Sequence, residues 1–222
     1  MRRIIALLLF VAACGRPLSV AETDLAARLF GATLDTTAVR LHRTGLVGLT
    51  THRFAVRPQT TCRERIVPPP EGTHETGRVA GVALWNHLHV RANLYRSDFV
   101  RRDDGAMTLG TAMFLAHELT HVWQWQNRAR TLYSPWRVGA EHRPGVDPYL
   151  FDTGSNPRFL DYGYEQQASL VEEYVCCMAL HPDGARTVRL HALLAQVMAP
   201  GDLPDVPVVL PWEGVDRRGI CG

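Results

Sequence analysis

The motif His-Glu-x-x-His constrains this sequence more than any other feature, and it lies within the stretch TAMFLAHELTHVWQW at residues 111–125. Its histidines, His117 and His121, are four residues apart and therefore lie on one face of an α-helix. Both imidazoles can bind one Zn²⁺, while Glu118 lies about 100° round the helix, beside the open coordination position. From there its carboxylate can deprotonate metal-bound water, whose pKa the metal lowers to about 7. The motif predicts a metal-binding helix.

The surrounding residues predict that this helix is amphipathic and runs over residues 107–127. The face opposite the histidines is apolar and consists of Ala112, Leu115, Leu119 and Val122. The face that carries the histidines is small or polar, with Gly110 and Gln124 beside them. We therefore expect a buried back and a front that lines a site, with Gln124 as a candidate to support a liganding histidine. The alternative is an exposed helix that carries the two histidines on its surface.

A second helix, predicted over residues 163–181, supplies candidates for the third protein ligand that a catalytic zinc site needs. Its two stripes are Glu165, Ser169, Glu172 and Cys176 on one side and Leu170, Val171, Tyr174 and Met178 on the other. Glu165 is the candidate ligand, because Ala168 in the same turn is small where a second helix must approach closely. Glu172 is a candidate to accept an N–H from a liganding histidine and so fix its tautomer. The alternative is a solvated acidic stripe, and Glu173 and His181 are further ligand candidates.

The remaining elements follow from periodicity and turn residues. In chain order they are a loose tether leading into a short helix at 16–35, a β-hairpin at 39–56, a loop at 57–78, a strand at 87–95, a packing helix at 184–198 and coil at 199–212. The strand at 87–95 alternates strictly, with His87 and His89 on its polar face. We expect these two histidines and His74 to face solvent, with metal binding as the alternative. The aromatic stretch at 129–163 is predicted to be an ordered insertion that forms a wall of the cleft, or else a local mini-core.

The first residues have the features of a secretory signal. Arg2 and Arg3 precede an apolar run of about ten residues, which is too short to span a membrane as a helix. The run ends in Val-Ala-Ala-Cys, which resembles the lipobox of bacterial lipoproteins and implies cleavage before Cys14 and lipidation of its thiol. The next residue, Gly15, is not the aspartate that retains lipoproteins in the inner membrane. The alternative is an ordinary signal peptide cut near residue 13. Both predict export, and the lipobox predicts an envelope lipoprotein in the outer membrane.

Charge excludes several classes of function. Without residues 1–13, which contain two arginines, the chain carries 22 basic and 22 acidic residues and is formally neutral. A neutral chain has no electrostatic footprint for nucleic acid, so no nucleic-acid partner is expected. All basic residues are arginines, and the absence of lysine excludes Schiff-base and lysine general-base chemistry.

Four cysteines follow Cys14, namely Cys62, Cys176, Cys177 and Cys221. In an oxidising compartment this even number predicts one or two disulfides, with three pairings allowed. Cys176 and Cys177 diverge by about 100° on a helix and should not pair with each other. Cys221 is expected to fix the C-terminal tail. The rival interpretations are a cysteine zinc site and a redox protein. The absence of a C-x-x-C pair from the sequence argues against both.

The motif residues resemble those of the gluzincin zinc metallopeptidases, in which a helical glutamate follows His-Glu-x-x-His. The fuller pattern is AHELTHVWQ at 116–124, then Tyr162, then EQQA at 165–168. It is similar to small zinc peptidases encoded near Rhs and Vgr secretion proteins, and more distantly to the core domain of contractile injection systems. The resemblance covers about residues 80–182. It implies His117, His121 and Glu165 as zinc ligands and Glu118 as general base.

Two features of that family have no clear counterpart in the motif. Gluzincins often place an aspartate four residues after the helical glutamate, and that position is Ser169 here. They also use a tyrosine or histidine to stabilise the oxyanion, for which Tyr162, Tyr164 and His142 are the candidates.

The predicted fold class is α+β, with an N-terminal antiparallel β part packed on a helical zincin core that contains the motif helix and the second, glutamate-bearing helix. The predicted organisation is a signal peptide at 1–13, a tether at 14–35 and a single metallopeptidase-like domain at 36–222. The predicted function is a secreted or envelope-tethered zinc metallopeptidase that acts on peptides or proteins and reaches the membrane through Cys14. The alternative is a non-catalytic, zinc-stabilised module of the envelope or of a secretion system.

Overall fold

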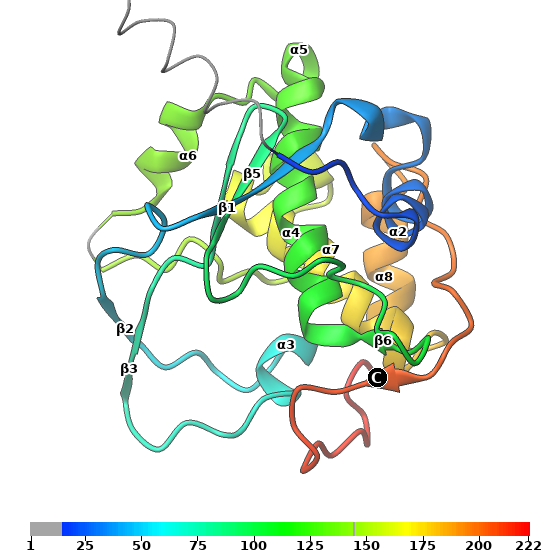
Figure 1. Cartoon of the computed structure of the whole chain (residues 1–222). Helices are drawn as coiled ribbons and strands as arrows, with labels where there is room; N and C mark the ends of the chain where they lie inside the picture. Colours follow the sequence, from blue (N-terminus) through cyan, green and yellow to red (C-terminus); the bar gives the residue numbers. More distant parts are fainter. Residues whose placement is uncertain (1–14, 144) are drawn as a thin grey trace, which may run out of the picture.

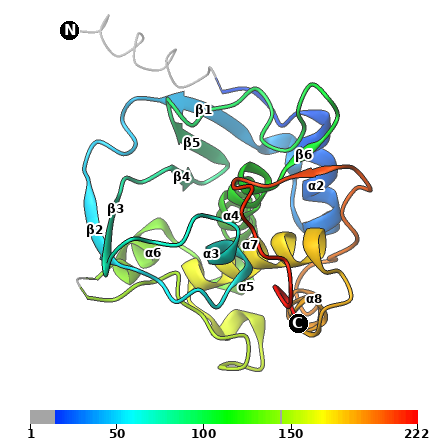
Figure 2. The same cartoon turned by 90° about the horizontal axis from the view of Figure 1, so that it is seen from below.

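The computed structural model describes residues 15–143 and 145–222, so the predicted signal peptide and Cys14 lie outside the described residues. Helix α4 (Leu109–Gln126) runs through the middle of the molecule, and α7 (Tyr164–Leu180) packs against it (Figure 1). Seen from below in Figure 2, a small sheet lies on one side of α4 and α7 lies on the other. The α+β class is therefore confirmed, with an N-terminal β part and a helical core.

Helix α4 forms at the predicted position. The apolar face opposite the histidines is buried along the whole helix, and this burial stabilises it. The four residues of this face are at most 1% exposed: Ala112, Leu115, Leu119 and Val122. Trp123 is also fully buried, and its indole N–H donates to Oγ1 of Thr33, which ties α4 to the N-terminal segment. The helix starts later than predicted, because strand β6 (Met107–Thr108) pairs in parallel with β7 (Val208–Val209). The segment 199–212 is therefore not all coil.

The two helices after residue 163 agree with the prediction in different degrees. Helix α7 matches the predicted range, and Ala168 is fully buried, as the close approach of α4 requires. Helix α8 (Ala185–Leu194) is shorter than predicted. Its Leu190 and Leu194 are buried as expected, whereas Val188 is 60% exposed and takes no part in packing.

The main sheet has three strands in the order β1 (Arg40–Thr44), β5 (His87–Arg91) and β4 (Gly81–Leu84). Strand β5 pairs in parallel with β1 and antiparallel with β4, so the sheet is mixed. The alternation predicted for this strand is confirmed at Leu88 and Val90, which are each 1% exposed, but the strand ends at Arg91 and not at residue 95 as predicted. Strand β4 is an edge of this sheet, and it lies against α4.

The predicted hairpin at 39–56 is wrong. Strand β1 pairs with β5, while β2 (His52–Ala55) pairs with β3 (His74–Gly77) from the segment predicted as loop. His74 therefore lies in a strand, although it is exposed as expected. The same segment also contains the short helix α3 (Cys62–Arg65). Alternation shows which face of a strand is buried, but it does not show which strand is the partner, and that is why the hairpin was mispredicted.

Residues 16–35 are more ordered than a loose tether. Helix α2 (Val20–Phe30) begins with a capping box, in which Oγ of Ser19 accepts from the backbone N–H of Glu22 and the Glu22 carboxylate accepts from the N–H of Ser19. The Glu22 side chain is fully buried and also receives two hydrogen bonds from the guanidinium of Arg16, at 2.6 and 2.7 Å. Leu25 and Leu29 are fully buried, so α2 belongs to the same core as α4.

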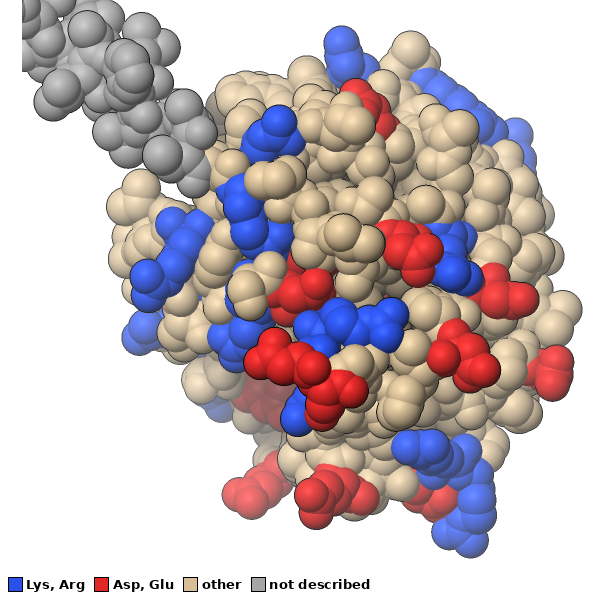
Figure 3. Space-filling view, turned by 45° about the vertical axis from the view of Figure 1, so that its right-hand side comes forward, with Lys and Arg blue, Asp and Glu red and all other residues tan. Residues whose placement is uncertain are grey.

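The other short elements complete the path. They are η1 (Gly31–Thr33), η2 (Thr36–Ala38), α5 (Arg128–Thr131), α6 (Pro135–Glu141) and η3 (Phe159–Asp161). Within the described residues, no helix has both the length and the apolar character to cross a membrane. On the face shown in Figure 3, acidic and basic side chains are interspersed, as expected for a chain of nearly balanced charge.

Two disulfides connect the four described cysteines. Cys62 pairs with Cys176 and Cys177 pairs with Cys221. The structure thus confirms that the adjacent cysteines do not pair with each other and that Cys221 fixes the C-terminal tail. Because all four are disulfide-bonded, the rival cysteine zinc site is not formed in this state.

Candidate metal centre

The two histidines of the motif meet the glutamate of the second helix at the contact between α4 and α7. Nε2 of His117 and Nε2 of His121 each lie 3.2 Å from Oε2 of Glu165. One ligand atom from each residue lies within 4.8 Å of the other two. His117 is 12% exposed, while the side chains of His121 and Glu165 are 7% and 6% exposed. The residues that the sequence nominated as ligands are therefore brought together.

Hydrogen bonds fix the tautomer of each imidazole. Nδ1 of His117 lies 3.3 Å from Oε2 of Glu172, and Nδ1 of His121 lies 2.9 Å from Oε1 of Gln124. Carboxylate and amide oxygens only accept, so both Nδ1 atoms must carry the proton. The side-chain amide nitrogen of Gln124 donates to the Tyr164 carbonyl and to Oε1 of Gln167, and these two bonds orient the amide so that its oxygen faces His121. Both Nε2 atoms then face Oε2 of Glu165, where each can donate a proton to the carboxylate or, once deprotonated, bind a metal ion.

The charges at this centre favour a cation. Burial alone would lower the pKa of His117, but the hydrogen bonds that its ring donates to Glu165 and Glu172 raise the pKa to about 10. Burial would raise the pKa of Glu172, yet the adjacent Arg63 and His117 hold it low, at about 2. The pKa of Glu165 is likewise lowered by His121 and His117 against the effect of burial. Two ionised carboxylates, Glu165 and Glu172, therefore stabilise a positive charge on the imidazoles between them. Without metal this charge comes from a bound proton, and a metal ion can take its place.

The donor set fits a divalent ion of the zinc type. Two imidazole nitrogens and one carboxylate oxygen, with the other ring nitrogens held by acceptors, form a three-ligand site with room for a fourth ligand. His117, Glu118, His121 and Glu165 all line one cleft of about 1160 Å³, from which a further ligand could reach an ion held there. The centre can therefore hold a metal ion and present it to a ligand in the cleft.

Glu118 lies beside this centre and lines the same cleft. Glu118 is buried, with 6% of its surface exposed. Burial raises the pKa of its carboxyl group, and the nearby His117 and His121 partly offset this increase. A carboxylate with a raised pKa next to a metal position is suited to accept and return a proton. Its place on the helix, one residue after His117, agrees with the sequence prediction.

Strands and an insertion form the two walls of the cleft. One wall consists of β4 together with residues 52–57 and 77–79, and the other consists of residues from 133–143, which include α6, and from 145–150. The prediction that the insertion at 129–163 supplies a wall is confirmed. The mini-core interpretation also holds in part, because Tyr133 and Phe159 are buried. Val90 lies in the central strand β5, and the edge strand β4 is the one that borders the cleft.

The oxyanion candidates have different positions. The hydroxyl of Tyr162 donates to the Asp152 carbonyl and that of Tyr164 to the Leu132 carbonyl, and neither residue lines the cleft. His142 does line it, with Nε2 at 3.4 Å from Oε1 of Glu165. Tyr149 also lines the cleft, although the sequence motif did not predict it. Its hydroxyl lies 3.1 Å from Nε2 of His142.

Two further residues of the site have no signal in the sequence motif. Tyr133 lines the cleft with its ring 6.3 Å from that of His121, and burial raises its pKa. Glu141, at the end of α6, accepts hydrogen bonds from the backbone N–H groups of Tyr164 and Glu165. Because it caps the start of α7, Glu141 fixes the turn that carries the third candidate ligand.

The other nominated ligands are not part of this centre. Glu173 accepts from backbone N–H groups of α3 and pairs with Arg186. His181 ends α7 near the C-terminal tail. His87 and His89 form a half-buried cluster with His42 on the sheet, rather than projecting singly into solvent.

Comparisons with known proteins support the fold. No family model and no curated protein matches the chain. Among solved structures, the chain is similar to the effector domain of Pseudomonas aeruginosa VgrG2b, with a TM-score of 0.52 and 23% sequence identity. The similarity covers 84% of this chain and 85% of that domain, so the two share their overall fold.

Proposed function

We propose that this chain is an exported zinc-dependent metallopeptidase of the gluzincin type. The observation that carries the proposal is the convergence of His117, His121 and Glu165 at the wall of an open cleft, with Glu118 beside them. A purely structural metal site is normally closed by four protein ligands, whereas this one offers three and faces a cavity. Zinc is the metal we infer, because imidazole and carboxylate ligands in this number are typical of catalytic zinc sites.

The chain's own residues supply the proton transfers. When bound, zinc would polarise a carbonyl and lower the pKa of a water molecule. We assign to Glu118 the role of taking the proton of the attacking water and delivering it to the leaving amine. Glu172 and Gln124 hold the two imidazoles in the tautomer that leaves Nε2 free to bind the ion. Tyr149 and His142 are the groups we assign to the developing oxyanion, because both face the cleft beside Glu165.

A polypeptide is the substrate that fits the cleft. Strand β4 presents an edge along the same cleft as the candidate metal ligands, and an extended peptide can add to such an edge through its backbone. The side chains of Val82 and Leu84 are each 37% exposed along this strand. A cleft lined mainly by such apolar groups favours substrates with apolar side chains on either side of the cleaved bond.

The proposed site of action is outside the cytoplasm. Two disulfides among the described residues are consistent with an oxidising compartment. The shared fold with an effector domain supports delivery or display by a related secretion system. We propose, on the lipobox alone, that Cys14 anchors the chain in the bacterial envelope.

Metal content and peptide cleavage, measured on three proteins, test this function. We expect one zinc per chain in the wild type and in Glu118→Gln, and none in Glu165→Ala. Cleavage of a peptide library should occur only with the wild type, and loss of the general base should cost at least about 10²-fold. Stoichiometric zinc without cleavage would favour the non-catalytic, zinc-stabilised module instead, and a chain without zinc would contradict both.

A further inference from the structure

A short helix outside the cleft is joined to the metal centre through one arginine. Arg63 on α3 donates from Nη1 to Oε2 of Glu172 at 2.9 Å. The same carboxylate oxygen lies 3.3 Å from Nδ1 of His117. The side chains of Arg63 and Glu172 are only 19% and 13% exposed, so water competes little for either charge. Arg63 therefore determines where the oxygen that orients His117 lies.

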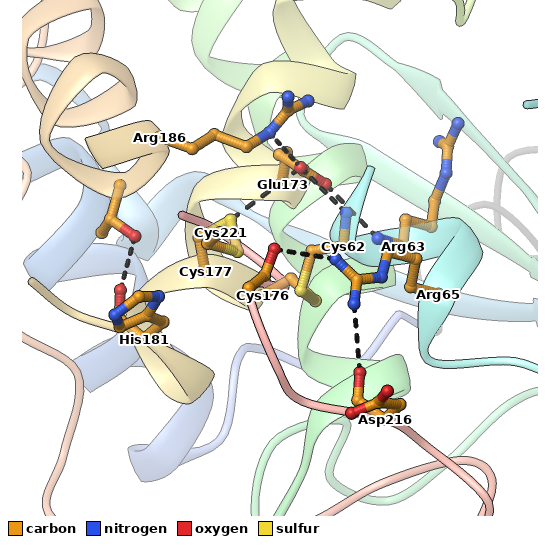
Figure 4. The surroundings of a disulfide bond; sticks show 12 residues. Cys62, Arg63, Arg65, Glu173, Cys176, Cys177, His181, Arg186, Asp216 and Cys221 are labelled. Carbon is orange, nitrogen blue, oxygen red and sulfur yellow. Dashed lines mark hydrogen bonds and ion pairs between the residues drawn. A yellow bond between two sulfur atoms is a disulfide. The ribbon is translucent and has the colours of Figure 1, made fainter. Parts of the chain in front are cut away.

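The position of Arg63 depends on covalent attachment. Helix α3 has four residues, too few to be stable by themselves. Figure 4 shows how it is held: Cys62 is bonded to Cys176 of α7, and the Glu173 carboxylate accepts from the backbone N–H groups of Cys62 and Arg63. The disulfide thus joins α3 to the same helix that carries Glu165 and Glu172.

A second attachment supports α3 from the other side. The guanidinium of Arg65 donates to the carbonyls of Asp216, Arg218 and Gly219 in the C-terminal tail. That tail is bonded to α7 through Cys177 and Cys221, directly beside the first disulfide (Figure 4). The hydrogen bonds of the Arg65 guanidinium go to this tail and not to Glu172, so Arg65 stabilises α3 without bonding to the metal centre.

We propose that Arg63 is a positioning residue for the metal centre and that the Cys62–Cys176 disulfide makes metal affinity depend on redox state. The inference rests on the proposed function insofar as it takes His117, His121 and Glu165 as the metal ligands. Loss of the disulfide frees α3, Arg63 leaves Glu172, and the carboxylate no longer holds His117 in the tautomer and orientation that bind metal. Residues that support a liganding histidine in this way typically change metal affinity by about 10–100-fold.

As a consequence, the metal centre gains its full affinity for zinc only after export. In a reducing cytoplasm the two thiols remain separate and the centre binds metal weakly. In an oxidising compartment a disulfide-exchange oxidant accepts two electrons and two protons from the two thiols, forming the Cys62–Cys176 bond and becoming a dithiol itself. High-affinity zinc binding then coincides with arrival in that compartment.

Zinc affinity, measured by competition with a chromophoric chelator, tests this inference on the purified oxidised protein. We expect Arg63→Gln to weaken zinc binding by about 10–100-fold and Arg63→Lys to lose less. Arg65→Gln, on the same short helix, is the matched control and should stay within about 3-fold of the wild type. Thermal unfolding of each variant establishes that it is folded. Equal affinity of folded Arg63→Gln and wild type would overturn the proposal.

A double-mutant cycle separates positioning from general loss of structure. If Arg63 acts through Glu172, adding Arg63→Gln to Glu172→Gln should weaken zinc binding no further. The absorption spectrum of the cobalt-substituted protein adds a readout of ligand geometry, and it should change in Arg63→Gln but not in Arg65→Gln. Fully additive losses in the cycle would show that Arg63 does not act through Glu172.

The disulfides are tested by serine variants, because free thiols would bind zinc themselves. The double variant Cys62→Ser/Cys176→Ser should weaken zinc binding by about 10-fold or more, whereas Cys177→Ser/Cys221→Ser should have a smaller effect. Equal affinities of the first double variant and the wild type would refute the redox link. A wild type that binds no zinc at all would refute the proposed function as well, so the two failures are distinguishable.

Discussion

Gly81 on the edge strand lies directly against Glu118 on the motif helix. A Cβ atom built at Gly81 would lie 2.7 Å from Oε1 of Glu118 and 2.7 Å from the ring of Phe114. Real Cβ atoms do not approach other atoms this closely, so only glycine leaves the carboxylate its present place. The residue that permits close approach of β4 and α4 therefore also determines the position of the proposed general base.

The first prediction concerns this contact. Gly81→Ala should retain zinc but lower kcat by about 10–100-fold, because displacing a catalytic group by about 1 Å costs that order of rate. Zinc content and steady-state kinetics measure the two effects. Gly45→Ala is the control, since a Cβ there meets nothing within 4 Å. An active Gly81→Ala enzyme would mean that Glu118 moves without penalty or is not the base.

The second prediction assigns the oxyanion to Tyr149. Burial raises the pKa of Tyr149, and the nearby Glu165 and Glu118 raise it further, so its hydroxyl stays protonated and can donate. Tyr149→Phe should lower kcat by about 10²–10³-fold with a smaller change in KM. Tyr162→Phe and Tyr164→Phe, whose hydroxyls bond to backbone carbonyls, should keep the wild-type kcat. Wild-type kcat in Tyr149→Phe with a large loss in Tyr162→Phe or Tyr164→Phe would assign oxyanion stabilisation to one of the tyrosines predicted from the sequence.

The sequence predicted the metal ligands because their arrangement is largely local. Two histidines on one helical face need no knowledge of the fold, and the spacing of Glu165 and Glu172 along a second helix predicts which of its residues share a face. The capping box at Ser19 and Glu22 is equally local, and it fixes the start of the short helix expected within 16–35, which packs into the core as α2.

The parts that the sequence did not predict depend on packing between distant segments. Tyr149 reaches the cleft from a segment without periodicity, so no spacing relates it to His117. Arg63 lies 109 residues before Glu172 and reaches it because α3 packs on α7, to which a disulfide also joins it. The role of Gly81 likewise exists only because β4 packs on α4.

The third prediction concerns stability. The disulfides span sequence separations of 114 and 44 residues. In the chain-entropy model, loops of these lengths correspond to about 5 and about 4 kcal/mol of unfolding free energy. Cys62→Ser/Cys176→Ser and Cys177→Ser/Cys221→Ser should each unfold at markedly lower urea concentration than the wild type. A midpoint unchanged by either double variant would contradict a structural role for that bond.

The fourth prediction concerns acid stability and the three histidines on the sheet. Nε2 of His42 lies 2.8 Å from Nδ1 of His87, and the ring of His42 stacks on that of His89 at 4.8 Å. Burial first, and the neighbouring imidazoles second, lower the pKa of His42, and the same causes lower that of His89. Arg40, paired with His87 across the strands, adds a further positive charge nearby.

A histidine whose pKa is lower in the folded state binds protons more readily when unfolded. Its contribution to stability is therefore present above the unfolded value of about 6.5 and is lost as the pH falls below it. We expect the unfolding temperature to fall between pH 7.5 and pH 5, and to fall less in His42→Asn. With zinc bound, His117 and His121 add a loss of the same sign in both proteins, since ligation requires their neutral form. The difference between the two pH profiles therefore reports the contribution of His42. Parallel pH profiles for His42→Asn and the wild type would show that these imidazoles do not set the acid stability of the fold.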